Sequence, residues 1–287
     1  MDRVRYVALL LSAGLLALLP GSGRAGPAVP AVSQNSETLF AQSAAAALSR
    51  EFSGRDISFL LFDARDGRVL ASRWDNPETP IPLGSLVKPF TALAYGEQHE
   101  FKYPPHMCRG TATGCWRPSG HGAMDLTSAI AYSCNSYFRM LASDMTAADV
   151  SPTAVRFGIE PPDHAANGAA LIGIGTQWRV SPLGMARAYL ELVRQRDQPG
   201  AREIVAGMAQ SARQGTGAEV DRALYFSALV KTGTASCTHA PHAPGDGFAV
   251  ALVPSDDPQI LLMVRVHGVP GAEAAKTAGQ ILRRIEE

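Results

Sequence analysis

A long stretch without strand character separates two groups of strand-like segments in this sequence. From Ser85 to about Thr216 no strong strand signal is present. Apolar periodicity and helix start signals predict helices there at 85–97, 124–131, 136–144, 147–157, 182–195 and 202–213. This stretch is therefore expected to fold as a helical unit of its own.

Strand-like segments flank the helical stretch on both sides. An apolar run at 57–63 and an alternating run at 68–74 are joined by an Arg65-Asp66-Gly67 turn, which predicts a hairpin. Strand character returns at 225–232, 247–253 and 259–267, and further helices are expected at 38–52 and 272–285. Short antiparallel connections favour placing all five strands in one sheet.

The predicted fold class is α/β (α+β): a five-stranded antiparallel sheet flanked by N- and C-terminal helices, plus an all-α lobe. The α/β lobe would comprise residues 36–84 and 217–287, and the helical lobe residues 85–216. A chain of 287 residues is long enough for one such two-lobed domain. Its 26 basic and 26 acidic residues give no electrostatic case for binding nucleic acid.

The N-terminus has the pattern of an export signal. Arg3 and Arg5 precede an apolar run from Val7 to Leu19, and Gly23-Arg24-Ala25 is a suitable cleavage site. We expect residues 1–25 to be a signal peptide and 26–35 a linker, with the protein in the periplasm or on the outer side of the cell envelope. An uncleaved anchor is the alternative, and only then would the membrane be a partner.

Export would make disulfides possible for the four cysteines. Cys108 and Cys115 enclose a short glycine-containing loop and form the most favoured bridge. Cys134 and Cys237 could pair or be small buried thiols, and buried thiols are slightly favoured. Cys237, with His239 and His242, could suggest a zinc site, but no fourth ligand is evident. We therefore interpret that segment as an exposed turn.

Residues 84–90 hold a serine and a lysine three positions apart, Ser85 and Lys88. On one helical turn the two side chains share a face. Burial among apolar neighbours favours the neutral amine, which can take a proton from the serine. Pro89 cannot donate a backbone hydrogen bond, so this first turn should be tight or irregular. Alone, the pair is weak evidence, because a helix start with a surface lysine has the same pattern.

Two later segments give this pair its context. Ser133-Cys134-Asn135 lies between two expected helices, and Lys231-Thr232-Gly233 ends the first strand expected after the helical lobe. The first could be only a helix cap and the second only a strand end. Together with Ser85, however, they all fall at the predicted boundary between the lobes, where clefts form.

With these motifs in this order, the sequence resembles the penicillin-binding transpeptidase family, serine acyltransferases that also include serine β-lactamases. The resemblance runs from about Ile57 to the C-terminus and includes the run Lys231 to Ala235 and the segment Gly173-Ile174-Gly175. It implies a β-lactamase/transpeptidase-like fold and a penicillin-binding, serine-type D,D-transpeptidase or carboxypeptidase acting on peptidoglycan in the cell wall. The implied partners are peptidoglycan stem peptides and β-lactam antibiotics, and no metal or organic cofactor is required.

The resemblance also assigns roles to individual residues. Ser85 would be the acylated nucleophile and Lys88 its base. Ser133 would relay protons to the leaving amine, and Asn135 would hold the substrate amide. Lys231 would supply positive charge for the substrate carboxylate. The remaining implied contacts are hydrogen bonds to that carboxylate from Thr232 and Thr234, an oxyanion hole of the Ser85 and Thr234 backbone N–H groups, and close approach of substrate at Gly233.

Two alternatives stay open at this point. A β-lactamase would share the acylation step. A class A enzyme needs a deacylating glutamate, and Glu160, in the right part of the chain, is followed by Pro161-Pro162 and lacks the expected setting. A class D enzyme would use a carbamylated Lys88, but two motifs of that class are missing. A non-enzymatic sensor of muropeptides or β-lactams would usually lose a motif residue, and none is missing. His121, Trp116 and Trp178 are interpreted as structural residues, although either tryptophan could line the cleft.

Overall fold

The protein is described by a computed structural model that covers residues 46, 48, 50–54, 56–237 and 245–286. The expected signal peptide, linker and most of the helix at 38–52 lie outside the described residues, as do His239 and His242. Among the described residues, no helix combines the length and apolar character that crossing a membrane requires.

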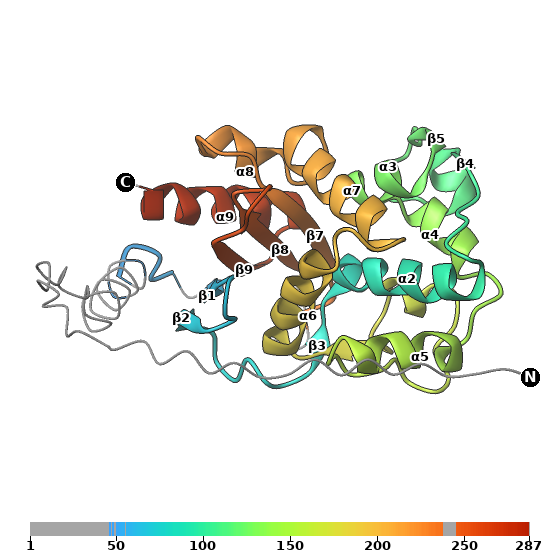
Figure 1. The fold of residues 1–287 in the computed structure, drawn as a ribbon, viewed down its shortest axis with the longest axis horizontal. Coiled ribbons are helices and arrows are strands. Elements are labelled where there is room, and N and C mark those ends of the chain that lie inside the picture. The colour runs from blue at the N-terminus through green and yellow to red at the C-terminus, as the bar shows by residue number, and fades with distance from the viewer. Residues whose placement is uncertain (1–45, 47, 49, 55, 238–244, 287) are drawn as a thin grey trace, which may run out of the picture.

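One five-stranded antiparallel sheet forms the centre of the fold, which confirms the predicted fold class (Figure 1). Its strand order is β2-β1-β9-β8-β7. The strands are β1 Ile57–Asp63, β2 Val69–Arg73, β7 Leu229–Ala235, β8 Asp246–Val253 and β9 Ile260–His267. Strands β9 and β8 lie between the N-terminal hairpin and β7. β7 is therefore an edge strand, and one of its sides pairs with no other strand among the described residues.

The helices lie close to the expected positions. They are α2 Lys88–Gln98, α3 Leu126–Ala131, α4 Asn135–Leu141, α5 Ala147–Arg156, α6 Pro182–Arg194, α7 Ala201–Gln214 and α9 Gly271–Glu286. Side-chain caps mark the starts of α3 and α6: Asp125 accepts the Ser128 N–H at 2.7 Å, and Ser181 accepts the Gly184 N–H at 3.2 Å. Local sequence thus determines where these two helices begin.

Several short elements were not predicted. They are the strand pairs β3 Ile81–Pro82 with β6 Arg179–Val180 and β4 His106–Cys108 with β5 Gly122–Met124, the helix α8 Ala218–Ala223, and the 3-10 turns Gly84–Val87, Gly110–Thr113 and Ala170–Ile172. Strands of two or three residues are too short to show an alternating pattern. The turn at Gly84–Val87 does confirm the irregular first turn expected before Pro89.

The expected strand at 225–232 is wrong at its start. The apolar residues Tyr225 and Phe226 suggested a strand, but they lie 75% and 58% exposed in the loop after α8. The Asp221 carboxylate accepts the Ala228 N–H at 2.8 Å, so the strand begins only after this contact. The strand β7 therefore contains the whole run Lys231 to Ala235, and this motif does not end the strand.

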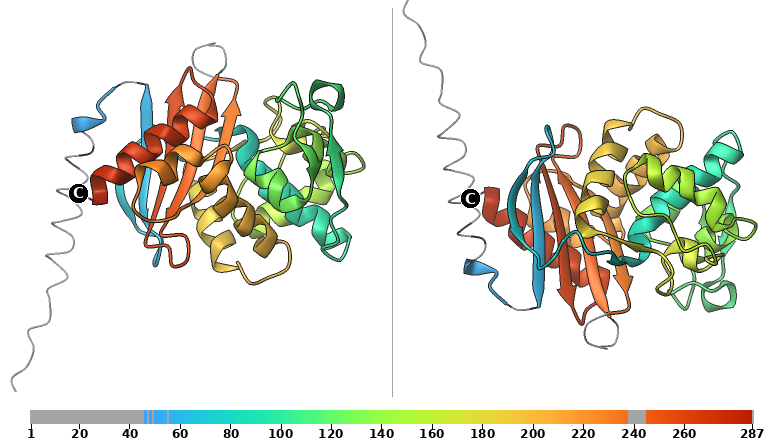
Figure 2. Two further views of the ribbon diagram at one scale, coloured as in Figure 1. Left: turned by 90° about the horizontal axis from the view of Figure 1, so that it is seen from above. Right: turned by 90° about the horizontal axis from the view of Figure 1, so that it is seen from below.

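Two apolar cores lie on opposite faces of the sheet. On one face, α8 and α9 cover a core that includes Val230, Ala251 and Val264 (Figure 2). On the other face, Phe62 and Phe248 belong to a larger core that continues into the helices. The site described next lies where that second core meets the edge strand.

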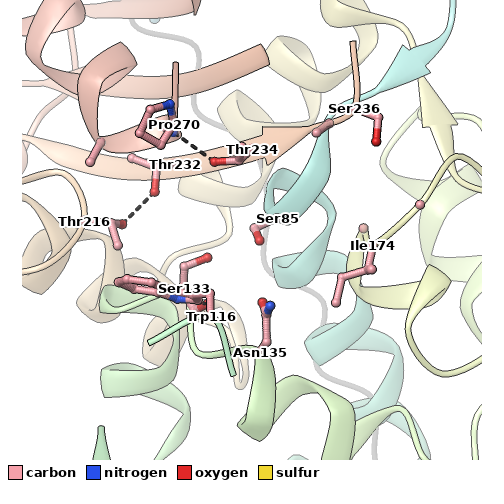
Figure 3. A pocket seen from close by; sticks show the side chains of 16 residues that line it. Ser85, Trp116, Ser133, Asn135, Ile174, Thr216, Thr232, Thr234, Ser236 and Pro270 are labelled. Atoms are coloured by element: carbon pink, nitrogen blue, oxygen red, sulfur yellow. Dashed lines mark hydrogen bonds between the residues drawn. The ribbon is translucent and has the colours of Figure 1, made fainter. Parts of the chain in front are cut away.

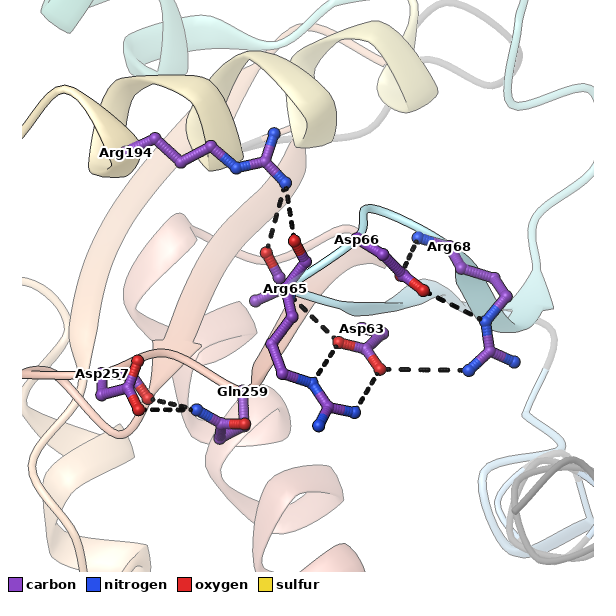
Figure 4. A network of polar contacts seen from close by, with 8 residues as sticks. Asp63, Arg65, Asp66, Arg68, Arg194, Asp257 and Gln259 are labelled. Carbon is purple, nitrogen blue, oxygen red and sulfur yellow. Dashed lines mark hydrogen bonds and ion pairs between the residues drawn. The ribbon is translucent and has the colours of Figure 1, made fainter. Parts of the chain in front are cut away.

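The turn after β1 is held by charged side chains within it and is hydrogen-bonded to α6 (Figure 4). The Asp63 carboxylate accepts two hydrogen bonds from the Arg65 guanidinium, at 2.9 and 2.6 Å. Arg194 of α6 donates to the backbone oxygens of Ala64 and Arg65, at 3.4 and 3.3 Å. The hydrogen bonds from Arg65 are the main reason that the pKa of Asp63 is lowered.

Candidate active site

Ser85 lies on a 3-10 turn that rests directly on the edge strand. Gly84, with φ of 57°, approaches β7 so closely that an added Cβ would lie 2.1 Å from the Thr234 backbone oxygen. A Cβ on Gly233 would likewise lie 2.5 Å from the backbone oxygen of Leu83. Gly233 thus makes room for this turn, whereas the sequence suggested that it makes room for substrate. Because both positions are glycine, the turn that carries Ser85 can lie directly against the backbone of β7 near Thr234.

Lys88 is fully buried, and its amine is hydrogen-bonded to Ser133 and Asn135. Nζ donates to the Ser133 backbone oxygen at 2.9 Å and to Asn135 Oδ1 at 2.5 Å, and it lies 3.5 Å from Ser133 Oγ. Among the described residues, no hydrogen bond joins Lys88 to the Ser85 hydroxyl. Burial lowers the pKa of Lys88 to about 7, so a substantial fraction of the amine is neutral near pH 7.

Ser133 links both lysines of the three motifs. Its Oγ accepts a hydrogen bond from Lys231 Nζ at 2.9 Å and lies 3.5 Å from Lys88 Nζ. Ser133 has φ of 51°, a left-handed conformation that is uncommon for a residue with a side chain. Burial, and then the charge of Lys88, hold the pKa of Lys231 well below its usual range. The amines of Lys88 and Lys231 therefore both lie next to the Ser133 hydroxyl.

The hydroxyls of β7 already have partners in the protein. Thr232 Oγ1 donates to Thr216 Oγ1 at 2.6 Å, and Thr234 Oγ1 accepts the Gly271 N–H at 2.9 Å. Because Thr234 accepts that bond, its own hydroxyl proton can be donated to an anion in the cleft. Thr216 was missed in the sequence, since a threonine after a helix carries no motif.

These residues surround one open cleft of about 330 Å³ (Figure 3). Its wall includes Ser85, Ser133, Asn135 and the threonines of β7, while the two lysines are fully buried and do not line it. The cleft is further lined by Trp116, Gly173, Ile174, Gly175, Thr216, Gly233, Ala235, Ser236, Pro270, Gly271 and Ala272. The structure thus brings together every site residue that the sequence predicted.

Other residues considered in the sequence lie elsewhere or differ from expectation. The Glu160 carboxylate accepts the Ser181 N–H at 3.0 Å and does not line the cleft. Trp178 is buried, as expected of a packing residue, whereas Trp116 is 53% exposed and donates to the Ser133 backbone oxygen at 3.2 Å. Trp116 therefore lines the cleft, a question that the sequence had left open for both tryptophans.

The disulfide expected between Cys108 and Cys115 is wrong. Among the described residues no disulfide joins these cysteines; Cys108, Cys115 and Cys134 are buried, and Cys237 is half-buried. Cys108 and Cys115 both face the ring of His121, with Sγ–Nδ1 distances of 3.6 and 3.5 Å. The two cysteines that enclose this loop thus both contact the same histidine ring.

Comparison with known proteins agrees with the fold. Residues 57–287 match the family described as the penicillin binding protein transpeptidase domain. No curated protein is matched by the sequence.

Solved structures of similar fold share little sequence with this chain. The transpeptidase domain of Burkholderia pseudomallei penicillin-binding protein 3 has a TM-score of 0.67 and 18% identity, over 91% of this chain and 97% of that one. Pseudomonas aeruginosa PBP2 in complex with WCK 5153 has a TM-score of 0.68 and 18% identity, over 86% and 73%. Helicobacter pylori PBP2 in complex with MreC has a TM-score of 0.72 and 16% identity, over 86% of this chain and 62% of that one.

Proposed function

Because the chain belongs to the penicillin-binding protein transpeptidase domain family, we propose that it is a serine D,D-acyltransferase acting on peptidoglycan stem peptides that end in D-alanyl-D-alanine. Ser85 forms the acyl-enzyme in this proposal. One observation carries it: the Ser133 hydroxyl lies between two buried lysine amines beside the cleft that Ser85 lines. Acyl transfer needs such a base and proton path next to a nucleophile.

The acylation step follows from this arrangement. Ser85 Oγ attacks the carbonyl carbon of the penultimate D-alanine and gives its proton to neutral Lys88. The oxyanion that forms is held by the backbone N–H groups of Ser85 and Thr234. The C–N bond then breaks, and the departing D-alanine amine receives a proton through Ser133. Lys88 must swing from Ser133 and Asn135 toward Ser85, since catalytic hydrogen bonds often form only with substrate bound.

In this proposal the substrate is bound by the positive charge of Lys231 and by the edge strand β7. The terminal carboxylate lies near Lys231 and accepts a hydrogen bond from Thr234, and a second one from Thr232 once that hydroxyl turns away from Thr216, while Asn135 holds the peptide amide. The side of β7 that pairs with no strand among the described residues can align an extended peptide by adding it as a strand. A β-lactam presents the same carboxylate and amide, so it acylates Ser85 as well. In this proposal the enzyme works after export, on the wall side of the membrane.

Acylation by a fluorescent penicillin tests the proposal. We expect intact-protein mass spectrometry to show one adduct on the wild type, and peptide mapping to place it on Ser85. Ser85→Ala should give no adduct, while Ser236→Ala, which alters another serine of the cleft, should keep it. An adduct of equal yield on Ser85→Ala, or none on the wild type, would show that Ser85 is not the nucleophile.

The lifetime of the adduct separates the proposal from its closest alternative. A transpeptidase or carboxypeptidase keeps the penicilloyl group for a long time, whereas a β-lactamase hydrolyses it and turns over. Incubation with a D-alanyl-D-alanine pentapeptide should release D-alanine. Incorporation of heavy-isotope oxygen from water, or of an added amine, then identifies the acyl acceptor.

A further inference from the structure

Three thiols and one imidazole converge beside the cleft. Cys108 ends β4, Cys115 follows the 3-10 turn after it, His121 precedes β5, and Cys134 directly precedes α4. Their four ligand atoms, three Sγ and one histidine nitrogen, all lie within 4.8 Å of one another. Cys108 is paired with Gly122 in the β4–β5 ladder, which brings it next to His121. The cluster is therefore built by the tertiary fold and does not follow from a short local motif.

The distances between these atoms fit one tetrahedral metal ion. With Zn–S bonds of about 2.3 Å and Zn–N bonds of about 2.1 Å, tetrahedral angles separate two sulfurs by roughly 3.8 Å and a sulfur from a nitrogen by roughly 3.6 Å. The Cys115 and Cys134 sulfurs lie 3.9 Å apart. His121 Nδ1 lies 3.6 Å from the Cys108 sulfur and 3.5 Å from the Cys115 sulfur.

The surroundings of the cluster suit a bound zinc thiolate. The three cysteines are at most 5% exposed and His121 is half-buried, so the three sulfur ligands are shielded from solvent. His121 is packed between the rings of Trp116 and Tyr132, with centroids 5.4 and 5.6 Å away. Zn²⁺ with three thiolates carries one net negative charge. Arg139 provides a cation beside the Cys108–Cys115 loop: an added Cβ on Gly114 would lie 3.0 Å from its Nε, which is buried without a hydrogen-bond partner among the described residues.

We infer that Cys108, Cys115, His121 and Cys134 bind one zinc ion, with the three thiol protons released to solvent. All four positions of the tetrahedron are filled by protein, so this is a structural site with no place for a reacting water. Cysteine thiolates with one histidine are a donor set that selects a soft divalent cation such as zinc over magnesium or calcium.

The metal also fixes the catalytic turn. Cys134 stands between Ser133 and Asn135, and the left-handed Ser133 needs its neighbours to hold it. Trp116, next to the ligand Cys115, donates to the Ser133 backbone oxygen. Zinc thus ties the 108–121 loop to the turn that contacts both lysines. This second part rests on the proposed function, whereas metal binding itself does not.

Metal analysis of the full chain, purified with a thiol reductant and supplied with zinc, tests the site. We expect about one zinc per chain by mass spectrometry. Exchange for Co²⁺ should give the visible absorption of a tetrahedral cobalt thiolate. The double variant Cys108→Ser/Cys115→Ser should lose the metal, while Cys237→Ser, which removes the cysteine outside the cluster, should keep it. Zinc at full occupancy in the double variant, or none in the reduced wild type, would overturn the inference, as would a native Cys108–Cys115 disulfide without metal.

The positioning role has a separate readout. Zinc removal by a chelator should slow penicillin acylation at least tenfold at a temperature where circular dichroism shows the fold intact, and added zinc should restore the rate. An unchanged rate after removal would contradict the positioning role but leave the site. Ser85→Ala should form no adduct and still bind one zinc, so failure of the proposed function and failure of the metal site give different results.

Discussion

At the scale of single residues, Ser133 is the centre of the site, because the amines of Lys88 and Lys231 both lie within hydrogen-bond distance of its hydroxyl. The sequence suggested a direct Ser85–Lys88 pair from their spacing alone. In the structure the Lys88 amine contacts Ser133 and Asn135 instead. A buried amine satisfies its donors with the nearest acceptors, and sequence spacing cannot rank acceptors from another helix.

The pH dependence of acylation follows from the pKa of Lys88. Only the neutral amine accepts a proton, and burial lowers its pKa to about 7. The acylation rate should therefore rise with pH, reach half its maximum near pH 7 and be about tenfold below its plateau one pH unit lower than the pKa. Stopped-flow measurements with a chromogenic β-lactam from pH 5 to 9 check this.

A matched variant identifies the titrating group. Lys88→Met removes the amine and should leave a slow reaction without the rising limb. A wild-type rate that still climbs steeply between pH 8 and 9 would indicate a base with an ordinary lysine pKa.

At the scale of elements, the contact between the Ser85 turn and β7 is made by backbone against backbone. Gly84 has no side chain to hold the two apart. Gly84→Ala would place a Cβ against the Thr234 backbone and also adopt a left-handed conformation, which costs about 1–2 kcal/mol. Misplacement of Ser85 by about 1 Å should slow acylation about 100-fold.

Gly158→Ala is the matched control for that substitution. Gly158 has φ of 69°, but an added Cβ meets no atom within 4 Å. It therefore bears the conformational cost without the clash, and its acylation rate should stay within about twofold of wild type. Equal acylation rates in the two variants would rule out the close contact as the reason for glycine at position 84.

Element boundaries show what local sequence determines in this chain. Helix starts at Asp125 and Ser181 were foreseeable, because their side chains cap the N–H groups that follow. The start of β7 was not, because Tyr225 and Phe226 look like strand residues but remain exposed. The cysteine cluster was missed for a related reason: Cys134 joins the others only through packing of α4 against β4.

For the whole molecule, one five-stranded antiparallel sheet with a helical block between its second and third strands was predictable from the order of the segments, whereas the strand order β2-β1-β9-β8-β7 was not. How tightly the helices join the sheet was not, since one core continues from Phe62 through Phe248 into the helices. The helical part and the sheet therefore share apolar packing rather than meeting only at the cleft. Such continuity depends on tertiary contacts that no segment pattern encodes.

Asp63 stabilises the folded protein, and this contribution to the free energy of unfolding depends on pH. Its pKa is lowered below 3.8, mainly by the hydrogen bonds from Arg65. The stabilisation is therefore present above pH 3.8 and is lost as the pH falls through the lowered pKa. Asp63→Asn should reduce the Tm at pH 7 by about 2–4 °C, the effect of roughly 1 kcal/mol in a domain of this size.

Thermal unfolding followed by circular dichroism at pH 7 and pH 3 measures this difference. The gap between wild type and Asp63→Asn should shrink at pH 3, because pH 3 lies below the ordinary aspartate pKa of 3.8 and Asp63 in the unfolded chain is then mostly protonated. Asp66→Asn, which alters an exposed carboxylate of the same turn, should change the Tm little at either pH. A gap that is the same at both pH values would show that Asp63 acts by packing and not by charge.

The position of Trp116 gives the molecule a built-in optical reporter. The other two tryptophans, Trp74 and Trp178, are buried, whereas the Trp116 indole stands in the cleft wall with its N–H on the Ser133 backbone. An occupant of the cleft changes the water around this one fluorophore and leaves the other two unchanged. Intrinsic emission can thus follow the arrival and departure of unlabelled ligands in real time, without a dye attached to either partner.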